Sequence, residues 1–562
     1  MIVGLDMGGT NVDAVVVEDG EIIRTVKRPT DRNNLFQSIW TVLEELLTGL
    51  DEKKISRINL STTVSTNAIV EGKADPVGMI IQRGPGLAYE FPECQGEKVF
   101  ISGYIDHRGQ VVKDLEIREI KRAIDLFREK NLRACAVVTK FSTRNPGHES
   151  RIKKLLEKEF PHVTMGHTLS GKLNFPRRVY TAYLNAAVAG TFRHFAESLR
   201  KSLSKAGIAA PVFILKADGG TMSLETAEAK PVESILSGPA ASLVGLMSMC
   251  PTDQDALLLD MGGTTTDIFF LADGLPVFEP LGIQIGAYKT LVRAVYSVSV
   301  GLGGDSALRV HEGELQIGPR REGPPFALGG PTATPTDAMM VLGLLEAEAA
   351  AGARAQEAMA SLGRQLGLSP EETAAKVLED MARLLKDKVD RLLAAINAKP
   401  VYTIKELLYG KKIKPQVIYI IGGPARAMAP VLSRRFGLPC HYPAHYQVAN
   451  AIGAALAKIT TEVTLLADTV QGTLAVPELG LHEQIGRRFN LAQARHKALA
   501  LLKERALALG ARPEEIEGEI VEESCFNMVR GFATTGQNIR IKAQVKPGLM
   551  EFLRGDTGES EK

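Results

Sequence analysis

The sequence predicts a two-lobed α/β protein, and three observations support this prediction. The block Asp6–Asp13 recurs as Asp260–Asp267 with six of its eight positions identical. Both copies are flanked by short apolar and β-branched runs bounded by Gly and Asp turns, which is typical of strands. A stretch at about 337–400, rich in Ala, Leu, Glu and Lys, has helical spacing. We therefore expect two related lobes, one beginning at residue 1 and the other near residue 255.

Each copy of the block predicts the same local order of strand, Gly-rich turn, strand, turn and strand. The apolar runs are 2–5, 14–17 and 21–26 in the first copy, and 257–259, 268–271 and 276–278 in the second. Later in the chain, a strand at 416–421 leads into Gly422-Gly423-Pro424 and a helix. A basic helix at about 488–510 and a β-like segment at about 530–545 follow.

Composition excludes several functional classes. The 562 residues carry 67 Lys and Arg against 65 Asp and Glu, a net charge of +2, and only 6% are aromatic, so neither a nucleic-acid partner nor base stacking is favoured. The five cysteines are dispersed, without the close spacing of zinc or redox motifs. No apolar run approaches the ~18 residues of a membrane helix, and no signal segment begins the chain, so we expect a cytoplasmic protein with no membrane partner.

The Gly-rich turns predict phosphate binding. Paired glycines let backbone N–H groups converge on one concavity, which suits phosphate oxygens, and threonine hydroxyls add donors. A plain hairpin turn is the alternative for either copy alone, but two copies at equivalent places favour phosphate. Walker A and Rossmann loops are not expected, because those loops run from a strand into a helix. The candidate residues are Gly8, Gly9 and Thr10 in the first turn and Gly262, Gly263, Thr264 and Thr265 in the second.

An aspartate stands at each end of both turns, and such carboxylates suit Mg²⁺, which takes oxygen ligands and keeps much of its water. The four candidates are Asp6, Asp13, Asp260 and Asp267. Two further glycine pairs are Gly303-Gly304 and Gly422-Gly423. Considered alone, each pair indicates only a structural turn. Together with the paired blocks, they complete a nucleotide site.

These residues resemble the superfamily of acetate kinases, sugar kinases, Hsp70 and actin, and within it the hydantoinase/oxoprolinase family, in particular its A-type, N-methylhydantoinase-like subunit. The matches fall in family order from residue 2 to about 457. They comprise, besides the two Asp blocks, Ser61–Glu71, Ala217–Gly220, Ser237–Ala241, Gly301–Ser306, Thr336–Ala338 and Gly422-Gly423. Two departures are Asn11, where relatives often carry an aromatic or aliphatic residue, and Ala217, which replaces a serine.

The resemblance implies two ribonuclease-H-like lobes with an interlobe ATP cleft and a small C-terminal region. We accordingly expect an N-terminal ATPase lobe with a substrate-side insertion, a second ATPase lobe with a helical insertion, and a C-terminal α/β region with a polar tail. Their expected limits are 1–250, 251–460 with the insertion at about 337–400, and 461–562. The polar tail is Asp556–Lys562.

The function that the resemblance implies is ATP-dependent activation of a carbonyl or lactam oxygen in a small cyclic amide, or of the enolate of a ketone, with ATP and Mg²⁺ as cofactors. A B-type hydantoinase subunit is a possible partner, in a homo- or hetero-oligomer. Carried over to this chain, Asp6, Asp260 and Asp267 would hold the metal, and Asp13 would orient or deprotonate the attacking group. Asn67 would line the substrate side.

A rival function stays open: an ATP-driven activator or switch that uses the same cleft to remodel a partner enzyme. A sugar or acetate kinase has less support, because the Ser61–Glu71 and Ser237–Ala241 stretches point elsewhere. Small cyclic amides or ketones would accelerate ATP turnover by an enzyme, whereas only a protein partner would accelerate a switch. Arg177 and Arg178 could meet anionic groups, but a solvated surface is the default expectation for both.

Overall fold

The computed structural model describes residues 1–8, 11–31, 34–86, 89–91, 93–279, 281–398, 412–550 and 553. Gly9 and Thr10 of the first predicted phosphate turn lie outside these residues, as does the predicted polar tail. No described helix combines the length and the apolar character needed to cross a membrane.

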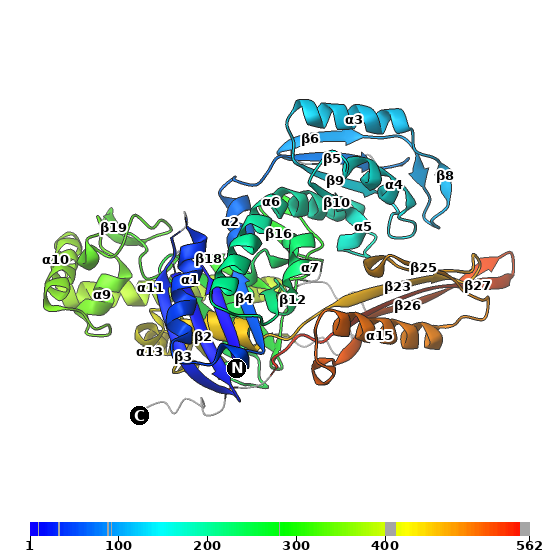
Figure 1. The fold of residues 1–562 in the computed structure, drawn as a ribbon. Coiled ribbons are helices and arrows are strands. Elements are labelled where there is room, and N and C mark those ends of the chain that lie inside the picture. The colour runs from blue at the N-terminus through cyan, green and yellow to red at the C-terminus, as the bar shows by residue number, and fades with distance from the viewer. Residues whose placement is uncertain are drawn as a thin grey trace.

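The N-terminal lobe is built on a six-stranded sheet in the order β12-β11-β4-β1-β2-β3 (Figure 1). β1, β2 and β3 form an antiparallel meander, and β4 and β11 continue the sheet parallel to β1. The strands are β1 (Ile2–Met7), β2 (Asn11–Glu18), β3 (Glu21–Pro29), β4 (Arg57–Thr62), β11 (Val212–Leu215) and β12 (Thr221–Ser223). Helices α1 (Leu35–Leu47) and α6 (Phe175–Lys205) pack against the core of this sheet.

The second lobe repeats this plan in the order β15-β14-β13-β21-β22, with β18 also paired to β14. β13 and β14 are antiparallel, and β21 and then β22 lie parallel on the other side of β13. The strands are β13 (Ala256–Met261), β14 (Thr266–Ala272), β15 (Leu275–Pro276), β18 (Ser297–Val300), β21 (Val417–Ile421) and β22 (Cys440–His441). The prediction of an α/β protein with two related lobes is confirmed, because an antiparallel meander leads into parallel strands in both.

Two helices, α8 (Ser237–Met249) and α14 (Ala449–Leu456), pack between the lobes in one apolar cluster that includes residues of both sheets. The approach is close because glycines stand at the contacts. A Cβ at Gly245 would lie 2.1 Å from the carbonyl oxygen of Ala449, and one at Gly4 of β1 would lie 2.2 Å from that of Ala451. The two helices thereby join the lobes through backbone-to-backbone packing.

An inserted unit follows β4 in the chain and lies above the N-terminal lobe in Figure 1. Its four-stranded parallel sheet has the order β10-β9-β5-β6. The elements are α2 (Val64–Val70), β5 (Val77–Gln82), β6 (Gly96–Phe100), β7 (Tyr104–Ile105), β8 (Val111–Lys113), α3 (Ile117–Glu129), β9 (Ala134–Thr139), α4 (Gly147–Leu156), β10 (His162–Met165) and α5 (Gly166–Leu169). The short helix α7 (Leu224–Ala229) follows β12.

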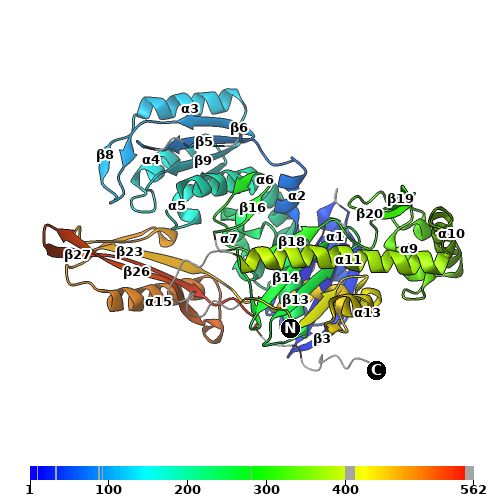
Figure 2. The ribbon, with the colours of Figure 1, turned by 180° about the vertical axis from the view of Figure 1, so that it is seen from behind.

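Helices dominate the segment that the sequence marks as a helical insertion. α9 (Pro335–Val341), α10 (Ala349–Leu366) and α11 (Pro370–Asn397) pack on the outer face of the second lobe, and Figure 2 shows α11 running along it. Side chains cap two of the three, since α9 and α11 begin with capping boxes formed by Thr334 with Asp337 and by Ser369 with Glu372. Two small hairpins precede α9 in the chain. They are β16 (Gln284–Ile285) with β17 (Tyr288–Lys289), and β19 (Leu308–His311) with β20 (Glu314–Ile317).

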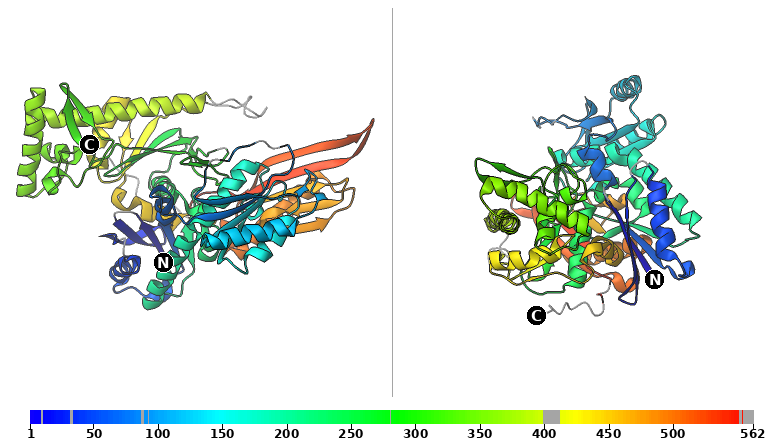
Figure 3. Two further views of the ribbon diagram at one scale, coloured as in Figure 1. Left: turned by 90° about the horizontal axis from the view of Figure 1, so that it is seen from above. Right: turned by 90° about the vertical axis from the view of Figure 1, so that its left-hand side faces the viewer.

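The C-terminal residues form a five-stranded antiparallel sheet in the order β25-β24-β23-β27-β26, covered on one face by α15. Helix α13 (Ala425–Phe436) precedes this region and belongs to the second lobe. The elements of the C-terminal region are β23 (Glu462–Asp468), β24 (Thr473–Val476), β25 (Leu481–Gln484), α15 (Leu491–Ala508), β26 (Gly518–Arg530) and β27 (Ala533–Val545). The β26–β27 hairpin extends away from the two lobes (Figure 3). The basic helix and the late β segment predicted from sequence are both present.

The expectation that Arg178 lies on a solvated surface is wrong. Its side chain is completely buried, and its guanidinium donates to the carbonyl oxygens of Thr139, Lys140 and Lys172. Burial lowers the pKa of Arg178 to about 10, opposed by the charge of Glu149. Arg178 thus fixes the loop before α6, a structural role that the sequence did not distinguish from a surface charge.

Candidate functional site

The four predicted aspartates form two equivalent pairs. Asp6 of β1 lies directly opposite Asp13 of β2, and Asp260 of β13 lies directly opposite Asp267 of β14. Residues that oppose each other on neighbouring strands project to the same face of a sheet. The repeated sequence block therefore produces a repeated structure, with one carboxylate pair at the same place in each lobe.

Both carboxylate pairs face the helices between the lobes. Side chains alternate along a strand, and the alternate residues Val15 and Val17 of β2 and Leu258 and Phe269 of the second lobe belong to the interlobe apolar cluster. Asp13 is two residues from Val15 and Asp260 is two residues from Leu258, so each aspartate projects to the same face of its strand as that apolar residue. All four carboxylates thus lie where this core reaches the ends of the strands next to the Gly-rich turns.

A chain of hydrogen bonds joins the two pairs. The Asn450 side-chain amide of α14 donates to Oδ2 of Asp6 at 3.3 Å. The Ser242 hydroxyl of α8 lies 2.6 Å from Oδ2 of Asp260 and 3.0 Å from Oδ1 of Asn450. The equivalent aspartates of the two lobes are therefore connected through one residue from each of the two helices that pack between them.

Burial makes these carboxylates unusually basic. It raises the pKa of Asp6 to about 7, with the charges of Asp13 and Asp260 adding to the effect and the polar side chains of Ser61 and Asn450 opposing it. Burial and the charge of Asp260 raise the pKa of Asp267 to about 6, against the side chain of Ser299. Such a group of mutually repelling, poorly solvated carboxyls gains most from a nearby cation.

Asp13 forms an ion pair with a lysine. Lys27 of β3 places its ammonium nitrogen 2.8 Å from Oδ2 of Asp13 and also donates to the carbonyl oxygen of Gln447. Burial raises the pKa of Asp13, and Lys27 opposes that rise. The lysine favours the ionised form, which is the form that a proton acceptor needs.

The Gly-rich turns have matching geometry in the two lobes. The Gly8 amide donates to the carbonyl oxygen of Asn11 at 2.9 Å, and the Gly262 amide donates to that of Thr265 at 2.8 Å. In the second turn, Thr264 is exposed and Thr265 is half-buried. The described part of the first turn thus closes as the second does.

Gly303, Gly304 and Gly422 pack directly against the second turn. The Gly304 amide donates to the carbonyl oxygen of Gly262, and a Cβ at Gly303 would lie 2.6 Å from that of Gly263. Gly422 has a φ of 92°, which only glycine adopts easily, and a Cβ at this position would lie 2.2 Å from the carbonyl oxygen of Met261. The structure therefore brings these predicted residues together, and Gly423 follows in the turn between β21 and α13.

Asn67 lies in α2, which follows β4 and begins beside the last residue of β1. Its side-chain amide donates to Thr63 Oγ1 at 3.1 Å, and the backbone N–H of Thr63 donates to the carbonyl oxygen of Met7. Asn67 is consequently one helical turn from Thr63, which contacts Met7, the residue before Gly8.

The donor set fits Mg²⁺ together with phosphate oxygens. Oδ1 of Asp6 and Oδ1 of Asp13 are buried and accept no hydrogen bond from the described residues. Across those same residues, no three His, Cys, Asp or Glu side chains converge on one metal position. This arrangement suits Mg²⁺, which binds one or two carboxylates and completes its shell with water and phosphate.

Three contributors to the site were not predicted: Asn450, Ser242 and Lys27. Ser242 directly follows the Ser237–Ala241 stretch, so its position beside a family motif was the available signal. Asn450 and Lys27 gave no signal, because only the tertiary structure brings them to Asp6 and Asp13. Leu236, at the start of α8, has a φ of 63°, which a bulky side chain rarely adopts. Its backbone N–H donates a hydrogen bond to Thr66 Oγ1, which holds this conformation.

Comparison with protein families finds two matches that cover most of the chain. Residues 2–160 match the hydantoinase/oxoprolinase N-terminal region, and residues 178–463 match the hydantoinase/oxoprolinase family itself.

Among curated proteins, the chain is similar to the caprolactamase subunit alpha of Pseudomonas jessenii, with 25% identity over 75% of this chain and 65% of the relative. It is 24% identical to the acetophenone carboxylase gamma subunit of Aromatoleum aromaticum over 69% of this chain and 61% of the relative. It is 26% identical to 5-oxoprolinase 1 of Arabidopsis thaliana over 61% of this chain and 31% of the relative. The matched part therefore spans less than two thirds of each of these relatives.

Two solved structures share the fold over nearly the whole chain. The ATP-dependent caprolactamase from Pseudomonas jessenii aligns with a TM-score of 0.72 and 21% identity, covering 96% of this chain and 87% of that one. Acetone carboxylase in a nucleotide-free state aligns with a TM-score of 0.70 and 17% identity, covering 98% and 87%. At these identities the likeness establishes the fold.

Proposed function

Because the chain belongs to the hydantoinase/oxoprolinase family, we propose that it is an ATP-dependent hydrolase that phosphorylates a carbonyl or lactam oxygen of a small cyclic amide, or the enolate of a ketone. The relatives named above include a caprolactamase, a 5-oxoprolinase and a carboxylase of a ketone, and a carbonyl oxygen is common to their substrates. Phosphorylation is a physically sensible activation, because an amide oxygen is a poor leaving group and a phosphate ester is a good one.

The observation that carries the proposal is the symmetry of the site. Two carboxylate pairs with raised pKa values stand beside two matching Gly-rich turns, and helices α8 and α14 link them. Such a pair of turns can present backbone N–H groups to a polyphosphate from both lobes. The buried Oδ1 of Asp6, which accepts no hydrogen bond from the described residues, supplies an oxygen for a cation.

We assign the roles as follows. ATP with Mg²⁺ would supply the transferable phosphoryl group and neutralise its charge. Asp6, Asp260 and Asp267 would hold the metal, directly or through its waters, while Gly262, Gly263, Gly303 and Gly304 would position the phosphates. Asp13, whose ionised form Lys27 favours, would accept a proton at a carboxylate oxygen, and Asn67 would orient the acceptor. Catalysis then consists of positioning and electrostatic stabilisation.

We also propose a B-type subunit as the partner of this chain. Two of the relatives are named as subunits, alpha of caprolactamase and gamma of acetophenone carboxylase. In this arrangement the present chain activates the carbonyl oxygen and its partner completes the reaction.

The test is Mg-ATP hydrolysis by the purified chain, alone and with hydantoins, 5-oxoproline, larger lactams and small ketones. Stimulation by one compound class would support the proposal and name the substrate. To test the proposed partner, the same measurements are repeated in the presence of a co-purified or co-expressed B-type subunit.

The same experiment distinguishes the rival function. If no small molecule stimulates turnover with or without a B-type subunit, but another purified protein does, the chain is an ATP-driven activator and the hydrolase proposal is wrong. Absence of Mg-ATP binding would contradict both functions.

A further inference from the structure

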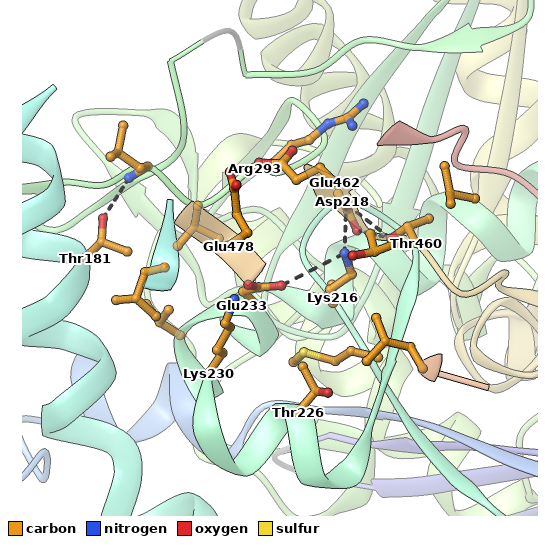
Figure 4. Close-up of a pocket in the computed structure, with 18 of the residues that line it drawn as sticks. Thr181, Lys216, Asp218, Thr226, Lys230, Glu233, Arg293, Thr460, Glu462 and Glu478 are labelled. Carbon is orange, nitrogen blue, oxygen red and sulfur yellow. Dashed lines mark hydrogen bonds and ion pairs between the residues drawn. The ribbon is translucent and has the colours of Figure 1, made fainter. Parts of the chain in front are cut away.

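A polar cavity of about 70 Å³ lies where the N-terminal lobe meets the C-terminal sheet (Figure 4). Its walls come from the β11–β12 turn, the segment after α7, the start of β23, the helix α15 and the strand β27. Its lining is unusually rich in charge. The cationic side chains are Lys172, Lys216, Lys230, Arg293, Arg505 and Lys542, and the acidic ones are Asp218, Glu233, Glu462 and Glu478.

The acidic side chains are already engaged. Lys216 lies 3.2 Å from Asp218 and 4.0 Å from Glu233, and Figure 4 shows its ammonium group between the two. Glu462 is paired with Lys542 at 2.7 Å. Glu478 accepts hydrogen bonds from the backbone N–H groups of Gly171 and Thr464.

Two of the lining lysines, in contrast, make no ion pair with a described residue. Within the described residues, the ammonium groups of Lys172 and Lys230 have neither a hydrogen-bond nor an ion-pair partner. Arg505 donates to the carbonyl oxygens of Glu462 and Glu478, and Arg293 donates to the side chain of Gln544. Burial lowers the pKa of both Lys172 and Lys230, and the charge of Glu462 opposes this shift in each of them.

We propose that this cavity binds a small oxyanion, a carboxylate, bicarbonate or phosphate group, through Lys172 and Lys230. An anion there would compensate the positive charge that the four acids leave over, and ammonium groups are suitable partners for anionic oxygens. The volume corresponds to roughly two water molecules at about 30 Å³ each, which limits the ligand to a few heavy atoms or to the charged end of a larger molecule.

Lys216, in the wall of the cavity, lies at the same edge of the N-terminal sheet as the start of the first Gly-rich turn. β11 is parallel to β4, which is parallel to β1, and Lys216 and Gly8 each follow the last residue of their strand. Neighbouring strands are about 4.8 Å apart, so two strand spacings separate β11 from β1 by roughly 10 Å. The Lys216 wall of the cavity is therefore roughly 10 Å from the end of β1. The inference does not require the chain to be an ATP-dependent hydrolase.

The experiment measures thermal unfolding of the nucleotide-free full chain with sodium phosphate, acetate or bicarbonate, each against chloride at equal ionic strength. Wild type, Lys230→Met and Lys172→Met are compared, with Lys201→Met on the exposed surface of α6 as the matched control. Methionine keeps the apolar stem and removes the charge, so both cavity variants are expected to fold. Isothermal titration calorimetry with the anion that stabilises most provides the affinity.

We expect one oxyanion to raise the melting temperature of wild type and Lys201→Met by several degrees, and to bind Lys230→Met and Lys172→Met at least tenfold more weakly. The identity of that anion distinguishes a carboxylate from bicarbonate or phosphate. Phosphate could also bind at the Gly-rich turns, so the difference between wild type and the cavity variants decides the outcome. Equal responses in all four proteins, or no response beyond that to chloride, would overturn the proposal.

Discussion

At the scale of single residues, Asp267 is the most direct test of the proposed metal site. We expect Asp267→Asn to reduce Mg-ATP turnover by roughly 100-fold or more, because it removes a preorganised charge from the reacting group. The fold should be retained, since burial already raises the pKa of this carboxyl to about 6 and a neutral amide suits the position. Steady-state hydrolysis and circular dichroism measure the two effects.

Asp273→Asn is the matched control for that variant. Asp273 stands in the turn just beyond the other end of β14, with a φ of 48° that asparagine tolerates. Its turnover should equal that of wild type. Normal turnover in Asp267→Asn would remove this residue from the metal site.

Asp6 predicts a pH dependence of stability in the metal-free protein. Its pKa rises from 3.8 to about 7 on folding, so the folded state holds a proton that the unfolded state has lost. Stability is therefore fully present below about pH 4 and falls as the pH rises towards 7, by roughly 1.4 kcal/mol per unit for one group. Urea unfolding of wild type and Asp6→Asn from pH 5 to 8 should show a shallower decline in the variant.

Asp267 gives an internal comparison for this effect. Its folded pKa of about 6 places its contribution at lower pH than that of Asp6, so Asp267→Asn should change the slope mainly below pH 6 and progressively less above it. If Asp6→Asn has the slope of wild type across the whole range, Asp6 is ionised in the folded protein and the assigned shift is wrong.

At the scale of elements, the contact between α8 and α14 determines whether the two lobes stay together. A Cβ at Gly245 would lie 2.1 Å from the Ala449 carbonyl oxygen, a separation that no real contact allows. We expect Gly245→Ala to lower the free energy of unfolding by about 1–3 kcal/mol or more, because one helix must move away from the other. Denaturant unfolding measures this loss.

Gly352→Ala in α10 separates that steric effect from the general effect of replacing a helical glycine. No atom lies within 4 Å of the position that its Cβ would take. The variant should be more stable by about 0.5–1 kcal/mol, since alanine loses less backbone entropy in a helix. A Gly245→Ala protein as stable as wild type would mean that the interlobe contact adapts freely.

At the scale of the whole molecule, the proposed site draws on both lobes at once. Hydrogen exchange should therefore show that Mg-ATP protects amides near Gly8 and near Gly262 together. Asn450→Ala should weaken this joint protection, because Asn450 contacts both Asp6 and Ser242 and so connects the two carboxylate pairs. Protection confined to one lobe would contradict a shared nucleotide site.

Much of the architecture could be predicted from local patterns. The repeated block fixed where the first two strands of each lobe lie, since its turns and apolar runs are adjacent in sequence and do not depend on distant contacts. The same local logic located α9, α10 and α11, the turn at Gly422-Gly423, and α15. Family resemblance then followed from motifs that are each a few residues long.

The sequence by itself therefore determined the two-lobed α/β plan, the pairs of aspartates and the family to which the chain belongs. Only the tertiary structure decided which distant residues complete the sites. Lys27 at Asp13, Asn450 and Ser242 between Asp6 and Asp260, and the lysines of the polar cavity come from separate parts of the chain. Arg178 shows the same limit, because whether a charged side chain is exposed or buried depends on what packs over it. The physical reason is that turn and strand preferences act over a few residues, whereas burial, charge compensation and pKa shifts depend on neighbours that only folding brings together.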